Sequence, residues 1–362
     1  MKTRTLLLPA ALLATLFVSG SALVSGSAAA LERSSPIKAA IIVSDNTPYN
    51  NLDACIFMAG ALFNEHIAPA IVNYQAVDTM SELLEYDVFI FGSCGHYYGD
   101  RDSGYGIIED EVRSFVEDHG RGVVGVGGVN YTCAANRYHD YDAILPIHAH
   151  VPYGYLWGYD IDITEPAHPI TTQVGNFGFD VTGLAEWCPG GTKTGSFVLA
   201  EYVQNNRESV VYWSTGPAQG RVAYVGPFFL ADADNFATLE LFQDPDAVRL
   251  LVNAVRWVSS KTTLSIDRLV PTQTSTITVV NAQPGHTVIT AYSVHGGGPV
   301  NSPWGEILLT PPFVTLPHRI ADQHGMVIDT RTCPNLPGLQ LWLQSLDLEE
   351  GRLSNGWDGV IE

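Results

Sequence analysis

The chain has 362 residues and is acidic, with 38 aspartates and glutamates against 18 lysines and arginines and a formal net charge of −20. A chain of this length is expected to form about two domains, because a single hydrophobic core seldom grows past ~250 residues. The scarcity of basic residues argues against nucleic acid and anionic membranes as partners, because binding to polyphosphate requires lysine and arginine.

The first 30 residues have the pattern of a secretory signal peptide. Lys2 and Arg4 precede an apolar segment at 6–18, and small residues follow up to Ala30. We therefore predict a secreted protein, extracellular or periplasmic, with cleavage after Ala30. An N-terminal membrane anchor is the alternative interpretation, although Pro9 interrupts the apolar run. No later stretch approaches ~20 uninterrupted apolar residues, so no membrane span is expected after cleavage.

The first half of the chain alternates strand and helix patterns. Short apolar runs predict strands at 38–43, 70–74, 86–92 and 122–126, and apolar residues at helical spacing predict helices at 53–62, 79–85 and 107–119. Such alternation indicates an α/β domain with a flavodoxin-like parallel sheet and helices on both faces. Loops at the carboxyl ends of such strands form the usual ligand crevice.

The second half of the chain changes pattern twice. Residues 136–159 are rich in Tyr and His with little periodicity, which predicts an extended surface insertion. Runs at 160–163, 197–202, 209–213 and 221–225 predict an antiparallel extension of the sheet, and 244–259 a closing helix. Beyond it, short strands between Gly/Pro turns indicate an all-β sandwich. The predicted domains are therefore 36–260 and 262–362.

Four segments of the first domain resemble the ThuA-like (trehalose-utilisation) branch of the class I glutamine amidotransferase-like fold. They lie at 112–126, 162–171, 220–226 and 249–257, and the resemblance covers roughly 37–260. Catalytic members of the wider fold place a nucleophilic Cys just after the strand equivalent to 122–126, and ThuA-like members tend to carry a His there. The turn here is Gly127-Gly128, so the resemblance implies a degenerate active site. The second domain resembles a β-rich module of secreted bacterial proteins, on 264–266, 282–285 and 342–347, which implies no activity.

A candidate catalytic thiol lies at another turn of the same predicted domain. Cys94 follows a predicted strand, His96 could lower the pKa of its thiol and act as a base, and Asp100 or Asp102 could orient the imidazole. The alternative is a disulfide between Cys94 and Cys133, which follow neighbouring strands at one edge of the sheet. Five cysteines in an exported chain are compatible with one or two bridges.

Metal and ligand sites are also predicted near the crevice. His148 and His150 would point the same way on a strand, and His139, Asp140 or Asp142 could supply the further ligands of a divalent metal. Aromatic side chains on loops can stack on sugars or bind proteins, or can pack the insertion onto the sheet. The residues predicted to contact a ligand are Tyr97, Tyr98, Asn130, Tyr131, Trp157, Asp45 and Asp232.

We therefore expect a secreted, non-catalytic binding or accessory protein with a carbohydrate or protein ligand. No cofactor is expected beyond the candidate divalent metal. The alternative is a hydrolase or sugar-modifying enzyme that uses Cys94 and His96, or a His/Asp metal site.

Overall fold

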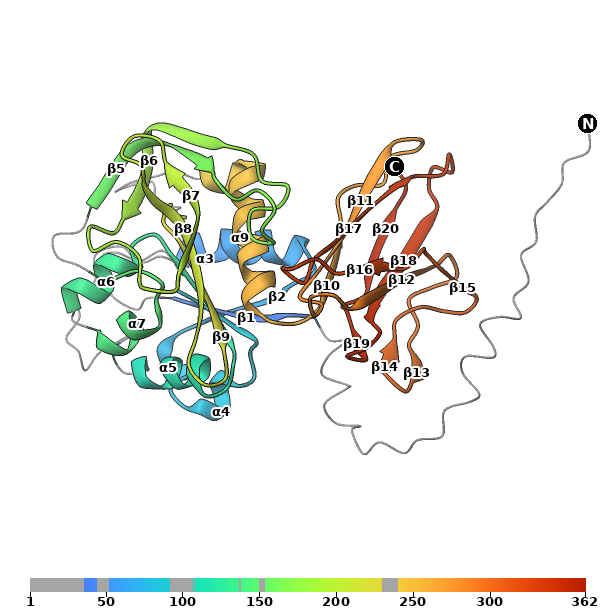
Figure 1. Ribbon diagram of the computed structural model, residues 1–362, viewed down its shortest axis with the longest axis horizontal. Helices are drawn as coiled ribbons and strands as arrows, with labels where there is room; N and C mark the ends of the chain where they lie inside the picture. Colours follow the sequence, from blue (N-terminus) through green and yellow to red (C-terminus); the bar gives the residue numbers. More distant parts are fainter. Residues whose placement is uncertain are drawn as a thin grey trace, which may run out of the picture.

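The computed structural model describes residues 36–43, 52–91, 106, 108–136, 138–149, 154–229 and 240–362. Figure 1 shows an α/β domain on the left, joined after α9 to a β-rich domain on the right. The elements of the α/β domain are β1 (Lys38–Ile42), α3 (Leu52–Asn64), β2 (Ala68–Val72), η1 (Tyr74–Ala76), α4 (Met80–Leu83), β3 (Val88–Phe91), α5 (Glu109–Glu117), β4 (Gly122–Val126), α6 (Val129–Asn136), α7 (His139–Ile144), β5 (Gly154–Ile163), β6 (Phe177–Trp187), β7 (Phe197–Tyr202), β8 (Arg207–Thr215), β9 (Gly220–Val225), α8 (Glu240–Gln243) and α9 (Pro245–Val258).

A single sheet organises the α/β domain. Within the described residues it has nine strands in the order β2-β1-β3-β4-β9-β8-β7-β5-β6. The strands from β2 to β9 in this order run parallel, and the strands from β8 to β6 continue the sheet through antiparallel pairings. The predicted parallel sheet with an antiparallel extension is confirmed, but β9, predicted within the extension, is the last parallel strand: it pairs parallel with β4 and antiparallel with β8. The parallel part has the flavodoxin-like order 2-1-3-4-5, with β9 in the fifth place.

Alternate residues of the central strands enter two separate cores. Ile41 and Ile90 pack with α3 and α9, whereas Ile42 and Phe89 pack with α4, α5 and α7. Successive side chains of a strand point to opposite faces, so a strand covered on both faces needs apolar residues at every position. This is why β1 and β3 are unbroken apolar runs in the sequence.

The segment after β4 differs from the expected extended insertion. The sequence predicts this insertion at 136–159, but there α7 follows α6 and β5 begins at Gly154, and the side chains of Tyr138, Tyr141 and Ile144 are buried. The ring of Tyr141 meets that of Phe91 edge to face at 4.6 Å. The prediction failed because these aromatic residues form the buried side of a short helix and not a loop surface.

The second domain is built of antiparallel sheets. Its strands are β10 (Thr263–Ile266), β11 (Thr274–Val280), β12 (Thr287–Ser293), β13 (Val300–Ser302), β14 (Gly305–Ile307), β15 (Phe313–Thr315), β16 (Arg319–Ile320), β17 (Val327–Thr332), β18 (Gln340–Asp347), β19 (Arg352–Leu353) and β20 (Trp357–Val360). Leu264 and Val279 of the β10-β11-β17 sheet share one core with Val288 and Leu343 of the β12-β18 sheet. Two sheets that bury a common core face to face form a sandwich-like module.

Direct polar contacts hold the two domains together. Asn281 of the second domain donates its Nδ2 to the carbonyls of Arg256 (2.8 Å) and Lys261 (2.9 Å), and its Oδ1 accepts from Arg221 (2.6 Å). Lys261 forms an ion pair with Asp87 at 2.7 Å. Hydrogen bonds between Asn281 and residues of the first domain and of the linker therefore fix the connection between the two domains. None of the described helices is long and apolar enough to cross a membrane.

Candidate functional site

The turn after β4 is closely packed against the exit of β9. The N–H of Gly127 donates to the carbonyl of Pro227 at 3.1 Å. A Cβ atom on Gly127 would lie 2.6 Å from the carbonyl oxygen of Gly226 and 2.6 Å from Cδ2 of Phe228. Both distances are well inside the ~3.5 Å separation at which non-bonded carbon atoms attract. Position 127 therefore has no room for a cysteine side chain unless the backbone moves.

The carboxyl group of Glu186, on β6, occupies the backbone donors of this turn. It accepts hydrogen bonds from the N–H groups of Gly128 (3.1 Å), Asn130 (3.1 Å) and Tyr131 (2.6 Å). The hydroxyl of Tyr224 lies 3.4 Å from Oε2. The unpaired N–H groups at a helix N-terminus are ready-made anion ligands. At α6 these donors are taken by a carboxyl group of the protein itself.

Burial governs the ionisation of this carboxyl group. The side chain of Glu186 has no solvent exposure. Burial raises its pKa to about 7, and the three backbone hydrogen bonds and the Tyr224 hydroxyl oppose that rise. A pKa near neutrality suits a general acid or base, but a group without exposure cannot reach a substrate. We interpret Glu186 as a structural plug.

The predicted thiol site lies outside the described residues. This applies to Cys94, His96 and Asp100, and to the predicted ligand contacts Asp45, Tyr97, Tyr98 and Asp232. Their roles stay predictions, as does the Cys94–Cys133 disulfide, for which the structure adds only that Cys133 is buried.

The remaining predicted ligand contacts fall into two groups. Asn130 and Tyr131 are buried, whereas Trp157 is 52% exposed. The Tyr131 ring lies 6.5 Å from that of Tyr155, which lies 6.0 Å from that of Phe228. The buried members pack the turn, and Trp157 alone of these three offers a broad exposed face. Their role in ligand binding stays a prediction.

The predicted histidine metal site is only partly described, because His150 lies outside the described residues. His139 opens α7, and His148 lies beyond its end, where its carbonyl accepts a hydrogen bond from the Cys188 thiol. Within the described ranges, the one group of side chains spaced to hold a metal ion is His286, Asp347 and Glu349 in the second domain. The described part of the chain therefore does not bring His139 and His148 together with a third ligand.

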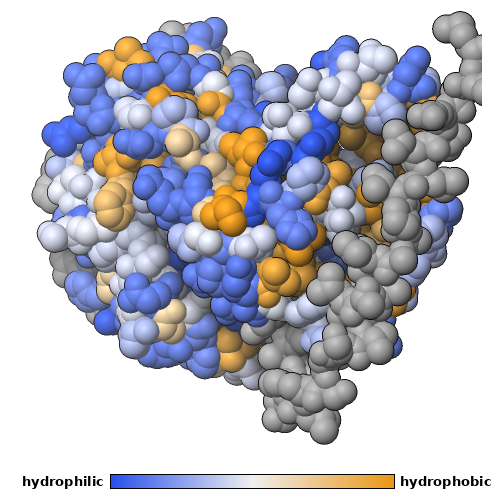
Figure 2. Space-filling model, turned by 45° about the vertical axis from the view of Figure 1, so that its right-hand side comes forward, coloured by the Kyte–Doolittle hydropathy of each residue, from blue (hydrophilic) through white to orange (hydrophobic). Residues whose placement is uncertain are grey.

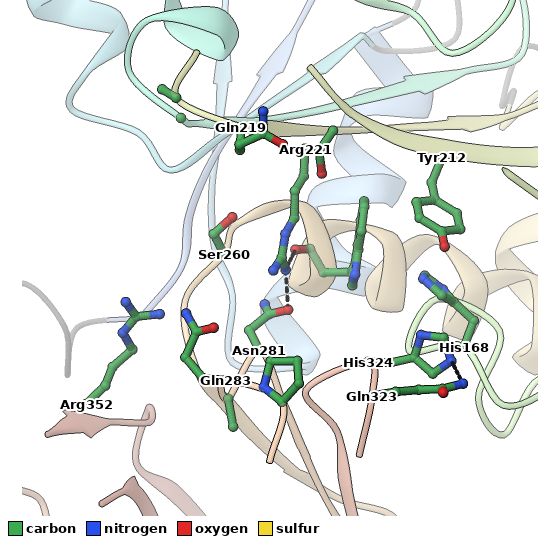
Figure 3. Close-up of a pocket in the computed structure, with 16 residues that line it drawn as sticks. His168, Tyr212, Gln219, Arg221, Ser260, Asn281, Gln283, Gln323, His324 and Arg352 are labelled. Carbon is green, nitrogen blue, oxygen red and sulfur yellow. Dashed lines mark hydrogen bonds between the residues drawn. The ribbon is translucent and has the colours of Figure 1, made fainter. Parts of the chain in front are cut away.

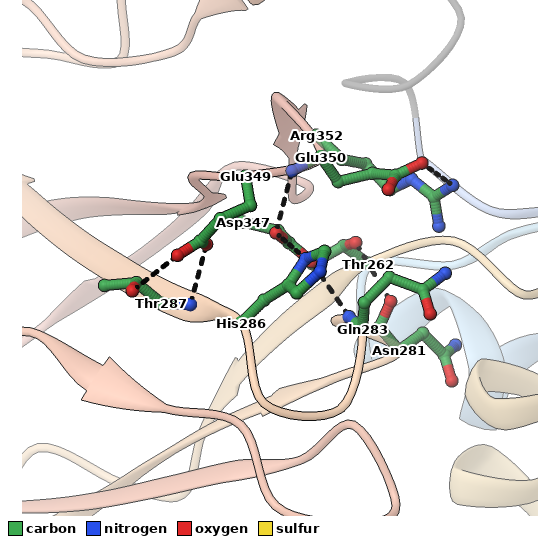
Figure 4. A network of polar contacts seen from close by, with 9 residues as sticks. All are labelled: Thr262, Asn281, Gln283, His286, Thr287, Asp347, Glu349, Glu350 and Arg352. Atoms are coloured by element: carbon green, nitrogen blue, oxygen red, sulfur yellow. Dashed lines mark hydrogen bonds and ion pairs between the residues drawn. The ribbon is translucent and has the colours of Figure 1, made fainter.

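The His286 group is occupied by internal hydrogen bonds (Figure 4). Nδ1 of His286 lies 2.9 Å from Oδ1 of Asp347, whose Oδ2 accepts the N–H of Gln283 at 2.8 Å. Glu349 accepts both the N–H and the hydroxyl of Thr287, each at 2.8 Å. These bonds join the start of β12 to the turn after β18. We interpret this network as structural.

A polar cavity of about 410 Å³ lies between the two domains. Figure 2 shows the two lobes meeting at a notch, with hydrophilic and hydrophobic residues along the seam, and Figure 3 shows the cavity itself. Arg221 extends into it from β9. Its Nη1 donates to the carbonyl of Trp257 (3.0 Å) and to Oδ1 of Asn281 (2.6 Å), and its guanidinium lies 5.0 Å from the centre of the Trp257 ring.

Two histidines, one from each domain, form another part of the cavity wall. The ring of His168 stacks on Tyr212 at 4.2 Å and lies 5.5 Å from that of His324. Arg352, on β19 beside β18, completes the basic lining. No single stretch of sequence predicts this cavity, because residues of both domains line it. The one local signal is a charged residue, Arg221, inside the apolar strand β9.

Comparison with protein-family models and with curated proteins found no match to this sequence. Among solved structures, a protein described as ThuA-like from Bacteroides uniformis is 18% identical, covering 63% of this chain and 93% of that one, with a TM-score of 0.39. Macromomycin is 12% identical (28% and 96% covered, TM-score 0.17). A superoxide reductase (neelaredoxin) from Ignicoccus hospitalis is 14% identical (28% and 78% covered, TM-score 0.16). Similarities of this size establish neither a family nor an activity, and the fold assignment rests on the strand order itself.

Proposed function

We propose that this is a secreted accessory protein that binds carbohydrate and has no catalytic centre at the turn after β4. The observation that carries the non-catalytic part of the proposal is the position of Glu186, whose carboxyl group takes the N–H donors of Gly128, Asn130 and Tyr131. In acyl-transfer enzymes, donors of this kind stabilise the negative charge that develops on the substrate. Here they stabilise the fold.

The packing of Gly127 supports the same proposal. The resemblance to the amidotransferase-like fold places a nucleophile in this turn, and glycine supplies none. A side chain at this position would meet the backbone of Gly226, so neighbouring elements have closed the space that a nucleophile needs. Both the nucleophile and the donors of an active site are therefore missing from this turn.

The interdomain cavity is the ligand site that we favour. Its volume of about 410 Å³ lies within the ~300–1,000 Å³ of small-molecule sites, which commonly form between domains. Its lining includes the amides of Gln219, Gln283 and Gln323 and the hydroxyls of Ser214 and Ser260. These groups donate and accept hydrogen bonds, as sugar hydroxyls require. The volume suits a small saccharide better than a protein ligand.

The test combines binding and turnover on the purified mature protein. We expect a glycan array to give binding, and ester, amide and glycoside substrates to give no turnover. Cys94→Ser should leave glycan binding unchanged, with Cys333→Ser in the second domain as the matched control. Turnover that Cys94→Ser abolishes and Cys333→Ser retains would overturn the proposal in favour of a thiol hydrolase.

A further inference from the structure

We propose that the interdomain cavity selects an acidic carbohydrate, one whose sugar ring carries a carboxylate. This inference rests on the proposed function and names the ligand class of that same site. The argument starts from the charge of the cavity wall, which is opposite to that of the whole protein.

The described residues that line the cavity include two arginines and two histidines, and none of them is acidic. The protein as a whole has 38 acidic residues against 18 lysines and arginines. Three carboxylates contact or influence the lining residues without lining the cavity. Glu350 pairs with Arg352 at 3.4 Å, Asp322 accepts the N–H of His324 at 2.9 Å, and Glu165 adds to the burial that raises the pKa of Tyr212. A cationic recess in an acidic surface concentrates field and attracts anions.

The guanidinium of Arg221 has only neutral acceptors among its described contacts. Nη1 donates to the carbonyl of Trp257 and to the amide oxygen of Asn281, and no ion pair with a described carboxylate accompanies these bonds. A charge removed from water is costly unless a counter-charge compensates it. An anionic ligand would supply that counter-charge.

The pKa shifts of Arg221 and His168 indicate a positive electrostatic potential in the cavity. Burial, followed by the charge of Arg352, lowers the pKa of Arg221 to about 10. Burial, followed by His324 and Arg221, lowers the pKa of His168 to about 3. Every charged neighbour that contributes to these two shifts is basic. With a pKa this low His168 is neutral at neutral pH, so the repulsion in the cavity is that between Arg221 and Arg352, and an anion there would offset it.

The backbone around the cavity is held in uncommon conformations. Gln219, Ser260 and Asn281 have positive φ angles of 55°, 56° and 63°. Non-glycine residues seldom adopt this region, and strain of this kind gathers at ligand sites, where it pre-organises side chains. Here three such residues surround one cavity.

The arrangement of the side chains defines what the ligand must carry. In Figure 3, Arg352, Arg221 and the paired His168 and His324 follow one another across the cavity, with amide side chains between them. A guanidinium presents its N–H groups as a planar fork that matches a carboxylate. Amides beside it match hydroxyl groups. A carboxylated sugar offers both.

The test measures binding of a matched pair of ligands by titration calorimetry. Digalacturonate carries the charge, and its dimethyl ester has the same rings without it; sodium sulfate is the third probe. The variants are Arg352→Gln and Arg221→Gln. Arg207→Gln is the control, since Arg207 lies over the Trp187 ring outside the cavity. Because Arg221 also holds the domain joint, the thermal unfolding of each variant is measured. If Arg221→Gln proves to be unfolded, the conclusion is drawn from Arg352→Gln alone.

We expect digalacturonate to bind at least tenfold more tightly than its ester and more weakly as salt is raised. Arg352→Gln should weaken its binding at least tenfold, and Arg207→Gln less than twofold. Equal binding of acid and ester would overturn the inference and leave the proposed function standing, as would glycan binding that Arg352→Gln does not alter. Sulfate that competes as well as digalacturonate would reduce the site to one for inorganic anions. Failure of every glycan to bind would remove both proposals.

Discussion

Glu186→Gln should abolish a specific part of the pH dependence of stability. In the folded protein burial raises the pKa of Glu186 to about 7, whereas in the unfolded chain the carboxyl group titrates near ~4.3. Folding therefore favours the protonated form. The stability that Glu186 contributes is fully present below the unfolded pKa and is lost as the pH rises through the folded one.

The magnitude follows from the difference between the two pKa values. One pKa unit corresponds to ~1.4 kcal/mol, so a group that titrates near 7 makes the wild type about 3 kcal/mol less stable at pH 8 than at pH 4. The glutamine variant has no such titration. Its Nε2 faces N–H donors where Glu186 presented oxygen, which costs about 1–3 kcal/mol at every pH.

The assay is urea unfolding of both proteins at pH 4 and pH 8, followed by tryptophan fluorescence. The quantity compared is the stability of the variant minus that of the wild type, because every other titrating group then cancels. We expect this difference to rise by about 3 kcal/mol between the two pH values. Glu85→Gln, at an exposed position, is the control for the loss of one charge and should give no rise. An equal difference at both pH values would show that the backbone donors hold the pKa of Glu186 at its ordinary value, and the reasoning would be wrong.

Three further predictions address the turn, the domain joint and the thiols. Gly127→Cys should lower the free energy of unfolding by about 1–3 kcal/mol, because the new Cβ would meet backbone atoms. Gly60→Cys is the control in the same denaturation assay: a Cβ at Gly60 would meet no non-neighbouring atom within 4 Å and should carry no steric cost. Asp87→Ala should lower the free energy of unfolding by about 3 kcal/mol, because it removes the carboxylate that pairs with Arg121 and Lys261. Asp358→Ala, at an exposed position, should change it by less than ~0.5 kcal/mol. Equal effects of the two substitutions would refute the role of the Asp87 ion pairs. Burial raises the pKa of the Cys188 thiol to about 12, so iodoacetamide at pH 8 should label it in unfolded but not in native protein, as read by peptide mass spectrometry. Equal labelling in both states would contradict this burial.

Several features of the structure are local in origin, and the sequence determined them. The unbroken apolar runs of β1, β3 and β4 specify strands covered on both faces, because a two-residue period leaves no polar face. Apolar positions at helical spacing specify α9, with Asp244 as its cap and Pro245 in its first turn. From these signals the α/β order and the following β-rich module could both be predicted.

The candidate sites were decided by the tertiary structure. Glu186 lies near the end of β6, a strand of mixed polar and apolar residues, and the N–H donors that it accepts from are 55 or more residues away in the sequence. Arg221 reaches Asn281 across 60 residues and a domain boundary. Such long-range contacts cannot be predicted from residue spacing, because they depend on how the sheet, α9 and the second domain pack. The two domains could therefore be predicted from the sequence. The turn filled by the Glu186 carboxyl group and the basic cavity form only when the domains are folded and packed together.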